Sequence, residues 1–178
     1  MPETQWPRYM VFVQERKKDP WRHFGTVHAP DADMALLNAR DVFARRPQAL
    51  GMQVVPAEVI FSKTLEELEN ASWADDELIG ESENYLIFAK PFEQSPCEHV
   101  GQVKAVSPQR ALKKALQTYS DQKALWWWVF PASELSASDD TDADSMFSPA
   151  LEKTYKNQSE YHTVTLMRQL HDKGKLES

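Results

Sequence analysis

The 178-residue sequence has few of the residues on which secreted, membrane-bound or phosphate-binding proteins depend. Its one cysteine, Cys97, excludes an internal disulfide and fits a reducing compartment. Its five glycines are scattered, so there is no glycine-rich phosphate loop. No apolar run approaches the ~20 residues of a membrane span, and no basic segment followed by an apolar run indicates a secretory signal. We therefore expect a cytoplasmic protein without a membrane partner.

Catalytic and metal-binding motifs are also missing. The sequence contains neither Gly-x-Ser-x-Gly nor Cys-x-x-Cys, and no glutamate stands three residues before any of the five histidines. A carboxylate-bridged di-iron site needs that Glu-x-x-His pair on one helix face. The net charge of −7 argues against nucleic-acid binding, which normally uses a basic face. We predict no catalytic residue, no metal ligand and no cofactor in this chain.

The most informative feature present is an internal repeat. Residues 9–46 align without a gap to residues 85–122, and ten of the 38 paired positions are identical. Two copies are too few for a solenoid, and one copy of about 60 residues would bury little surface alone. We therefore predict a fused pseudo-dimer, with two copies packed about a pseudo-twofold axis. The identical pairs are Tyr9/Tyr85, Phe12/Phe88, Pro20/Pro96, His23/His99, Gly25/Gly101, Val27/Val103, Ala29/Ala105, Ala35/Ala111, Leu36/Leu112 and Ala39/Ala115.

Each copy has the pattern ββαβ. A continuous apolar run, typical of a strand covered on both faces, opens each copy, and a second strand follows a polar loop. The helix of the first copy can be capped by Asp31 or Asp33, and that of the second by Ser107 before Pro108. The fold class is therefore α+β, two tandem ββαβ modules with helices on the sheet faces. Third strands are predicted at 52–60 and 125–135.

The repeat divides the chain into five parts. The two modules are residues 6–63 and 84–135. The connection at 64–83 carries eight acidic residues and no Lys or Arg. Residues 136–145 are small and acidic, which predicts a mobile loop. Residues 146–178 mix aromatic and polar side chains and predict an extended C-terminal arm.

Three histidine and cysteine positions could carry chemistry. Pseudo-twofold symmetry could bring His23 and His99 together at a metal or acid–base site. A histidine that starts each second strand and makes a structural hydrogen bond explains the repetition as well, and we favour it because no metal-ligand spacing accompanies the pair. Cys97 lies beside His99, but adjacent strand residues point to opposite faces, and a lone thiol is usually inert.

Three consecutive tryptophans open the third strand of the second copy. Strand alternation places Trp127 opposite Trp126 and Trp128, so at least one ring should lie on a surface or an interface. The rings either pack between the two copies or anchor a protein partner.

A basic helix end distinguishes the first copy. The helix dipole explains cations at Arg45 and Arg46 but leaves Arg40 unexplained. The second copy has Leu116, Asp121 and Gln122 at these positions. We predict that the arginines contact a carboxylate cluster of a protein partner, with a bound acyl-CoA phosphate as the alternative.

Longer motifs resemble a known family. The first copy contains W-P-x-Y-x-V-F-V at 6–13, H-x-G-x-x-H-A at 23–29 and M-A-L-x-N-A-R-D at 34–41. The second copy contains W-V-F-x-A-S-E-L at 128–135, and the tail contains F-x-P-A-x-x-K-x-Y at 147–155. These segments resemble the phenylacetic acid degradation B family, the B subunit of bacterial phenylacetyl-CoA epoxidase.

The resemblance implies a non-catalytic, cofactor-free subunit that bridges the catalytic heterodimers of a multicomponent oxygenase. In that family the di-iron catalytic subunit is a separate ferritin-like chain with a structural partner of similar fold, and a flavin and iron–sulfur reductase supplies electrons. Family members usually carry one module and self-associate, whereas this chain carries two, and residues 114–117 read K-A-L-Q where the first copy has N-A-R-D. The predicted partner contacts are Arg40, Arg45, Arg46, Trp126, Trp127, Trp128, Phe147 and Tyr155.

Two other functions fit the same sequence. The chain could be a stand-alone acyl-CoA-binding protein or a small-ligand enzyme, with its site between the copies near His23 and His99. It could also be an assembly protein for another oxygenase or pathway. In each case we expect two unequal faces, with arginines on the first copy and tryptophans on the second.

Overall fold

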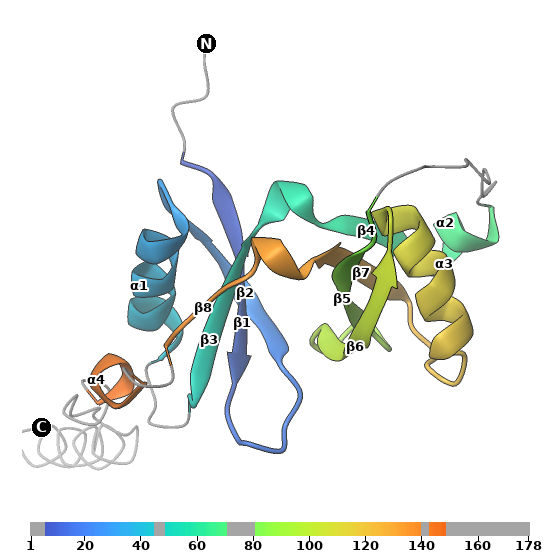
Figure 1. Cartoon of the computed structure of the whole chain (residues 1–178). Coiled ribbons are helices and arrows are strands. Elements are labelled where there is room, and N and C mark those ends of the chain that lie inside the picture. Colours follow the sequence, from blue (N-terminus) through green and yellow to red (C-terminus); the bar gives the residue numbers. More distant parts are fainter. Residues whose placement is uncertain (1–5, 45–48, 71–80, 140–142, 149–178) are drawn as a thin grey trace, which may run out of the picture.

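The computed structural model describes residues 6–44, 49–70, 81–139 and 143–148. They combine one antiparallel eight-stranded sheet with a few helices, as the predicted α+β class requires (Figure 1). The elements are β1 (Arg8–Gln14), β2 (Arg22–His28), α1 (Ala32–Phe43), β3 (Gly51–Pro56), η1 (Ala57–Val59), β4 (Phe61–Thr64), α2 (Leu65–Glu69), β5 (Glu83–Lys90), β6 (Glu98–Ala105), α3 (Pro108–Thr118), β7 (Trp126–Pro131), η2 (Ala132–Glu134), β8 (Ser136–Ala137) and α4 (Ala143–Phe147).

The strand order is the same from the centre of the sheet outward in both directions. The order is β4-β7-β5-β6-β2-β1-β3-β8, so each half runs from its second strand to its first and then to its third. The outermost strands are exchanged: β4 pairs with β7 of the second half, and β8 pairs with β3 of the first. Figure 1 places α1 and α3 at opposite ends of the molecule.

The repeated glycines allow each helix to approach the sheet closely. Gly25 pairs with Val11 and Gly101 with Ile87, beside equivalent irregularities in the strand register. A Cβ at Gly25 would lie 2.7 Å from the Phe43 ring, and one at Gly101 would lie 2.6 Å from Cζ of Tyr119. Gly25 also has φ of +152°, a conformation that favours glycine.

Both faces of the central strands are buried. Val11 and Val13 of β1 pack in the cluster beneath α1, whereas Phe12 between them points to the opposite face. Ile87 and Phe88 of β5 repeat this division, and all five side chains are at most 2% exposed. The expected double-sided burial of the first strands, drawn from their continuous apolar runs, is confirmed.

The helix starts follow the sequence. The Asp31 carboxylate accepts a hydrogen bond from the Met34 amide at 2.8 Å, and the Ser107 hydroxyl accepts one from the Arg110 amide at 3.3 Å. Such caps satisfy amides that the first turn leaves without partners. The caps predicted at Asp31 and Ser107 are confirmed.

The strand ends differ from the prediction. In place of each predicted third strand, the structure has a shorter strand followed by a 3₁₀ turn. The strands end at Pro56 and Pro131 because proline has no amide hydrogen to donate to the neighbouring strand. Ser136 and Ala137, predicted to begin the mobile loop, form β8 instead, and Ser138 exchanges hydrogen bonds with the Met52 backbone. The C-terminal arm beyond residue 148 lies outside the described residues.

Candidate functional site

The two halves of the sheet meet around a cluster of aromatic rings. We call Phe12, Val55, Phe88, Cys97 and Phe130 the central cluster. The ring centroids of Phe12 and Phe88 are 4.3 Å apart, and Phe130 lies 5.7 and 5.4 Å from them. The three rings are at most 1% exposed. The inside of the central cluster is therefore apolar, and among the described residues polar side chains lie at its edges.

His23 and His99 lie at those edges. The His23 ring packs edge-on against Trp128 at 4.9 Å, and the His99 ring lies 5.1 Å from Phe88. The Nε2 atoms of both rings are buried and have no hydrogen-bond partner. Burial lowers the pKa of each imidazole, while a backbone hydrogen bond to Gly25 or Gly101 acts in the opposite direction.

The backbone of the two histidines joins the halves. The His23 amide donates to the Cys97 carbonyl at 2.8 Å, and the His99 amide donates to the Trp21 carbonyl at 2.9 Å. Arg22 and Glu98, which are also equivalent positions, form an ion pair of 2.7 Å beside them. These are backbone hydrogen bonds that do not involve the imidazole rings, so a structural role for the two histidine side chains stays a prediction. Within the described ranges, no group of three His, Cys, Asp or Glu side chains could hold a metal ion.

Cys97 belongs to the central cluster and is only 3% exposed. Burial raises the pKa of its thiol to about 12, the nearby positive charge of Lys90 lowers it, and Glu98 raises it. Because the thiolate is the nucleophile, such a thiol is unreactive at neutral pH.

The three tryptophans divide as strand alternation predicts. Trp127 is 2% exposed and packs beneath α3, whereas Trp128 packs on the central cluster. Trp126 is 43% exposed, and the Lys90 ammonium lies 5.6 Å from the centroid of its ring. Of the three, Trp126 is the ring most available to a partner.

The predicted basic helix end is only partly described. α1 ends at Phe43, so Arg40 stands in its last turn, where a cation is favoured by the helix carbonyls. The expectation that the helix dipole leaves Arg40 unexplained was therefore wrong, because the helix is shorter than assumed. Arg40 also pairs with Asp41 at 3.1 Å. Arg45, Arg46 and Tyr155 lie outside the described residues, and Phe147 is buried in the cluster beneath α1.

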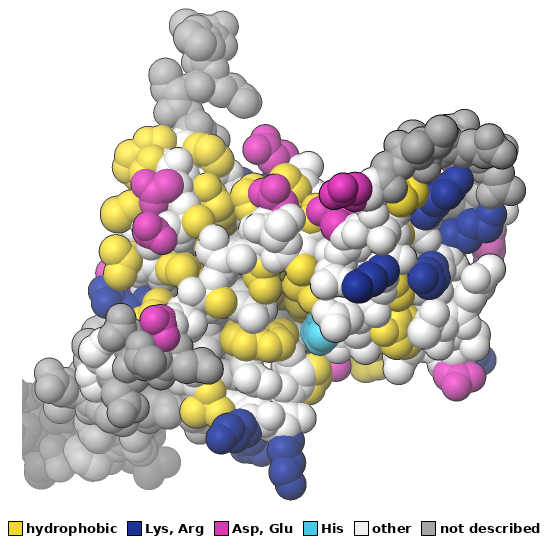
Figure 2. All heavy atoms as spheres, in the orientation of Figure 1, with side chains coloured by type: hydrophobic (Ala, Val, Ile, Leu, Met, Phe, Trp, Pro, Cys, Tyr) yellow, Lys and Arg dark blue, Asp and Glu magenta, His cyan; other side chains and the backbone are white. Residues whose placement is uncertain are grey.

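The outer faces of α1 and α3 differ in character, beyond the differences predicted from the sequence. Met34, Leu37 and Val42 of α1 are 40 to 45% exposed. Their equivalents on α3 are Arg110, Lys113 and Thr118. Figure 2 shows hydrophobic side chains gathered over α1 and basic side chains over α3. In the alignment of the two copies, this difference is visible at positions 34/110 and 37/113, where an apolar residue aligns with a basic one.

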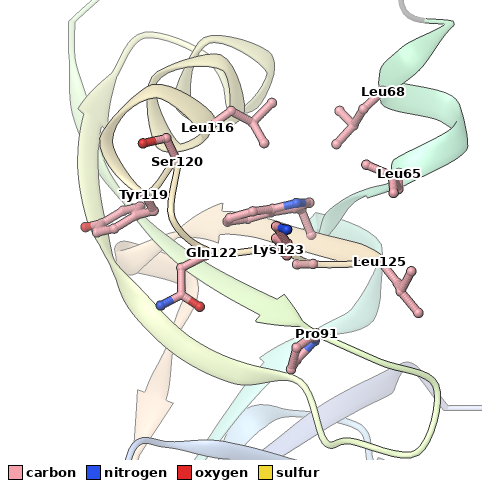
Figure 3. A pocket seen from close by; sticks show the side chains of 11 residues that line it. Leu65, Leu68, Pro91, Leu116, Tyr119, Ser120, Gln122, Lys123 and Leu125 are labelled. Atoms are coloured by element: carbon pink, nitrogen blue, oxygen red, sulfur yellow. The ribbon is translucent and has the colours of Figure 1, made fainter.

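We consider three clefts on the described surface as candidate sites. The α2–α3 groove, about 340 Å³, lies between the two helices, with Leu65 and Leu68 facing Leu116 across it (Figure 3). A second, about 380 Å³, we call the Lys90 cleft, and a third, about 440 Å³, the Gln14 cleft. The Lys90 cleft is lined by His23, Ser62, Lys90, Cys97, Trp126 and Trp128, and the Gln14 cleft by Gln14, Trp21, Gly51, Gln53, Ala137 and Asp139.

Comparison with known proteins identifies the family. The model of the family described as phenylacetic acid degradation B matches residues 5–77 and 81–168. The B subunit of 1,2-phenylacetyl-CoA epoxidase from Escherichia coli K12 is 42% identical over 67 residues, which are 38% of this chain and 70% of that protein. No solved structure matches. Within the described residues, no helix is long and apolar enough to cross a membrane. Because the family model matches most of both halves, the chain belongs to the phenylacetic acid degradation B family.

Proposed function

We propose that this chain is a non-catalytic, bridging subunit of a multicomponent di-iron oxygenase that resembles phenylacetyl-CoA epoxidase and acts in cytoplasmic phenylacetate degradation. The observation that carries the proposal is the family match over both halves, together with a relative that is itself a subunit of that epoxidase. The partners would be the catalytic di-iron subunit and its structural partner. Catalysis would take place on the catalytic subunit.

We further propose that the chain is a fused pseudo-dimer. Support comes from the strand order, which is the same in both directions from the centre, and from the exchanged strands β4 and β8. The matching hydrogen bonds of His23 and His99 cross the centre in opposite directions. A bridging subunit needs two partner-binding faces, and a pseudo-twofold arrangement provides two related ones within a single chain.

The outer face of α1 is the surface that we assign to the oxygenase partner. It presents Met34, Leu37 and Val42, and an apolar helix face left in solvent is typical of an interaction site. Arg40 on the same helix would add a cation at the edge of this surface. Trp126, on the other half of the molecule, would anchor a second contact, since exposed tryptophan is enriched at interface hot spots.

Co-purification tests this proposal. The full chain would be co-expressed with the catalytic subunits from its own genome, and it should elute with them. Leu37→Lys introduces the residue found at the equivalent position, Lys113, and should weaken co-elution at least about tenfold by placing a charge in an apolar contact.

Leu65→Lys is the matched control, because Leu65 is as exposed as Leu37 but lies on α2. This variant should still co-elute. If the unmodified chain elutes alone with all partners present, the bridging function is wrong. If both variants co-elute equally, the assignment of α1 as the partner face is wrong.

A further inference from the structure

The Lys90 cleft and the Gln14 cleft occupy equivalent places in the two halves. Lys90 pairs with Trp126 across β5 and β7, and Gln14 pairs with Gly51 across β1 and β3. The same registers make Trp128 the equivalent of Gln53. The inner strands of the two clefts therefore match, whereas the outer wall includes Ser62 of β4 in the Lys90 cleft and Ala137 of β8 in the Gln14 cleft.

The large and the small side chain stand at opposite positions in the two clefts. In the Gln14 cleft, Trp21 lies over Gly51, so close that a Cβ there would be 2.8 Å from its ring. In the Lys90 cleft the equivalent positions are Cys97 and Trp126. The indole of Trp126 stays 43% exposed and leaves an aromatic wall beside an open space of about 380 Å³. That volume lies within the ~300–1,000 Å³ of small-molecule sites.

The Lys90 cleft also carries a positive charge that its counterpart lacks. Among the described residues, Lys90 has no ion pair, whereas Glu98 nearby is engaged by Arg22 at 2.7 Å. Lys90, His23 and Cys97 line this cleft together, and, after the larger effect of burial, the Lys90 charge acts to lower the pKa of both His23 and Cys97. The Gln14 cleft has the neutral Gln14 at this position.

His23 contributes a polar group that remains unsatisfied. Its Nε2 is buried without a hydrogen-bond partner, and a buried group of this kind costs stability unless something pairs with it. The equivalent His99 shares this property but does not line the Gln14 cleft. Of the two equivalent clefts, the Lys90 cleft therefore combines two indoles, an unsatisfied imidazole and a cation that lies over the Trp126 ring without an ion pair.

We propose that the Lys90 cleft binds a small aromatic carboxylate, with its ring against Trp126 and Trp128 and its carboxylate on the Lys90 ammonium. Indole faces and edges favour planar aromatic rings, and an ammonium beside a carboxylate forms a charge-assisted hydrogen bond. This ligand site belongs to the chain alone, so it is independent of the bridging function.

Calorimetry on the isolated full chain with benzoate tests this proposal. We expect saturable binding of one benzoate per chain with a dissociation constant of about 1 mM or tighter. Benzamide has the same ring without the charge and should bind at least about tenfold more weakly. No saturable binding of benzoate, or equal binding of the two compounds, would overturn the proposal.

Two variants locate the site. Lys90→Met should weaken benzoate binding at least about tenfold, whereas Gln14→Met, at the equivalent position of the other cleft, should leave it unchanged. Trp126→Gly, which introduces the residue of the Gln14 cleft, provides a second test should Lys90→Met fail to show a cooperative thermal transition. Unchanged binding in a folded Lys90→Met or Trp126→Gly chain, or equal losses in Lys90→Met and Gln14→Met, would show that the benzoate binds elsewhere.

Discussion

The helices α1 and α3 pack on the sheet in the same way but present opposite surfaces to solvent. Ala35 and Ala39 of α1 are fully buried, as are Ala111 and Ala115 at the equivalent positions of α3. On the outer face, the pairs Met34/Arg110 and Leu37/Lys113 have diverged. The comparison shows which positions were constrained in the two copies. Side chains that set the distance between helix and sheet were kept, and side chains in solvent were free to change.

Where the two halves meet, buried positions are again the same in both copies, with one exception. Phe12 and Phe88 are identical and pack against each other, but Arg22 and Glu98 are equivalent positions with opposite charges. In a symmetric dimer of one module, this position would place two like charges beside the axis. A fused chain can place complementary charges there, so the two halves are distinguishable even at their contact.

The largest effects should come from the shared aromatic centre. Phe12→Ala and Phe88→Ala should each lower the free energy of unfolding by about 3–5 kcal/mol, because each removes a fully packed ring. Urea denaturation followed by circular dichroism would measure both. If the halves share one core, each variant should unfold in a single transition.

Phe92→Ala is the control for these two variants, since Phe92 is 61% exposed. It should change stability by less than about 0.5 kcal/mol. Two separate transitions in either central variant would mean that the halves fold as independent domains, contrary to a shared core.

The repeated glycines should be sensitive for two different reasons. Gly25→Ala and Gly101→Ala should each cost about 1–3 kcal/mol from overpacking against Phe43 or Tyr119. Adding Tyr119→Ala should recover much of the loss in Gly101→Ala. Adding Phe43→Ala should recover less in Gly25→Ala, because the backbone at Gly25 stays in a conformation unfavourable for alanine.

Thermal denaturation of the four single variants and the two double variants would test this difference. The quantity to compare is the coupling free energy from each double-mutant cycle, between Gly25 and Phe43 in one half and between Gly101 and Tyr119 in the other. Equal recovery in both halves would show that the positive φ of Gly25 contributes nothing.

The two buried histidines should make stability fall with acid. Burial lowers their pKa in the folded protein, so the unfolded chain binds more protons as the pH drops below the ordinary imidazole value of about 6.5. The stability is fully present above that value and is lost as the pH falls. Each histidine can add a slope of up to about 1.4 kcal/mol per pH unit.

Urea denaturation between about pH 7.5 and 5.5 would measure these slopes, a range chosen to lie mostly above carboxylate titration. His23→Gln and His99→Gln should each flatten the pH dependence, and the double variant should flatten it further. An unchanged slope in the double variant would mean that these imidazoles titrate alike in the folded and unfolded chain.

The smallest effect should come from the charged pair at the centre. Arg22 and Glu98 are about one-third exposed, so Arg22→Glu should cost at most about 1 kcal/mol. Exchanging both residues, as Arg22→Glu with Glu98→Arg, should restore most of that loss. Thermal denaturation at low salt would measure this loss and its restoration. If the double variant is no more stable than Arg22→Glu alone, the ion pair does not contribute to stability.

Much of the framework could be predicted from the sequence because it rests on local signals. The apolar runs predicted the central strands, and Asp31 and Ser107 predicted the helix starts. The exchange of β4 and β8 could not be predicted, because these short strands pair with residues far along the chain and carry no distinctive pattern. The length of α1 was overestimated, since nothing marks its end before Arg45.

The candidate site could be predicted less well than the fold. Trp126 to Trp128 were singled out, and alternation correctly divided them. Lys90 could not be predicted as a site residue, because it ends an apolar strand and its cleft forms where β5 meets β7. The apolar outer face of α1 could not be predicted, because Met34, Leu37 and Val42 alternate in the sequence with the apolar residues that face the sheet.

The central claim is that one duplicated framework carries two unequal faces, with the partner on α1. Hydrogen–deuterium exchange of the chain, alone and in the complex with co-expressed catalytic subunits, tests it most directly. Binding should slow exchange in peptides covering α1 and leave those covering α3 unchanged. Equal protection of both helices, or protection of α3 alone, would contradict the claim.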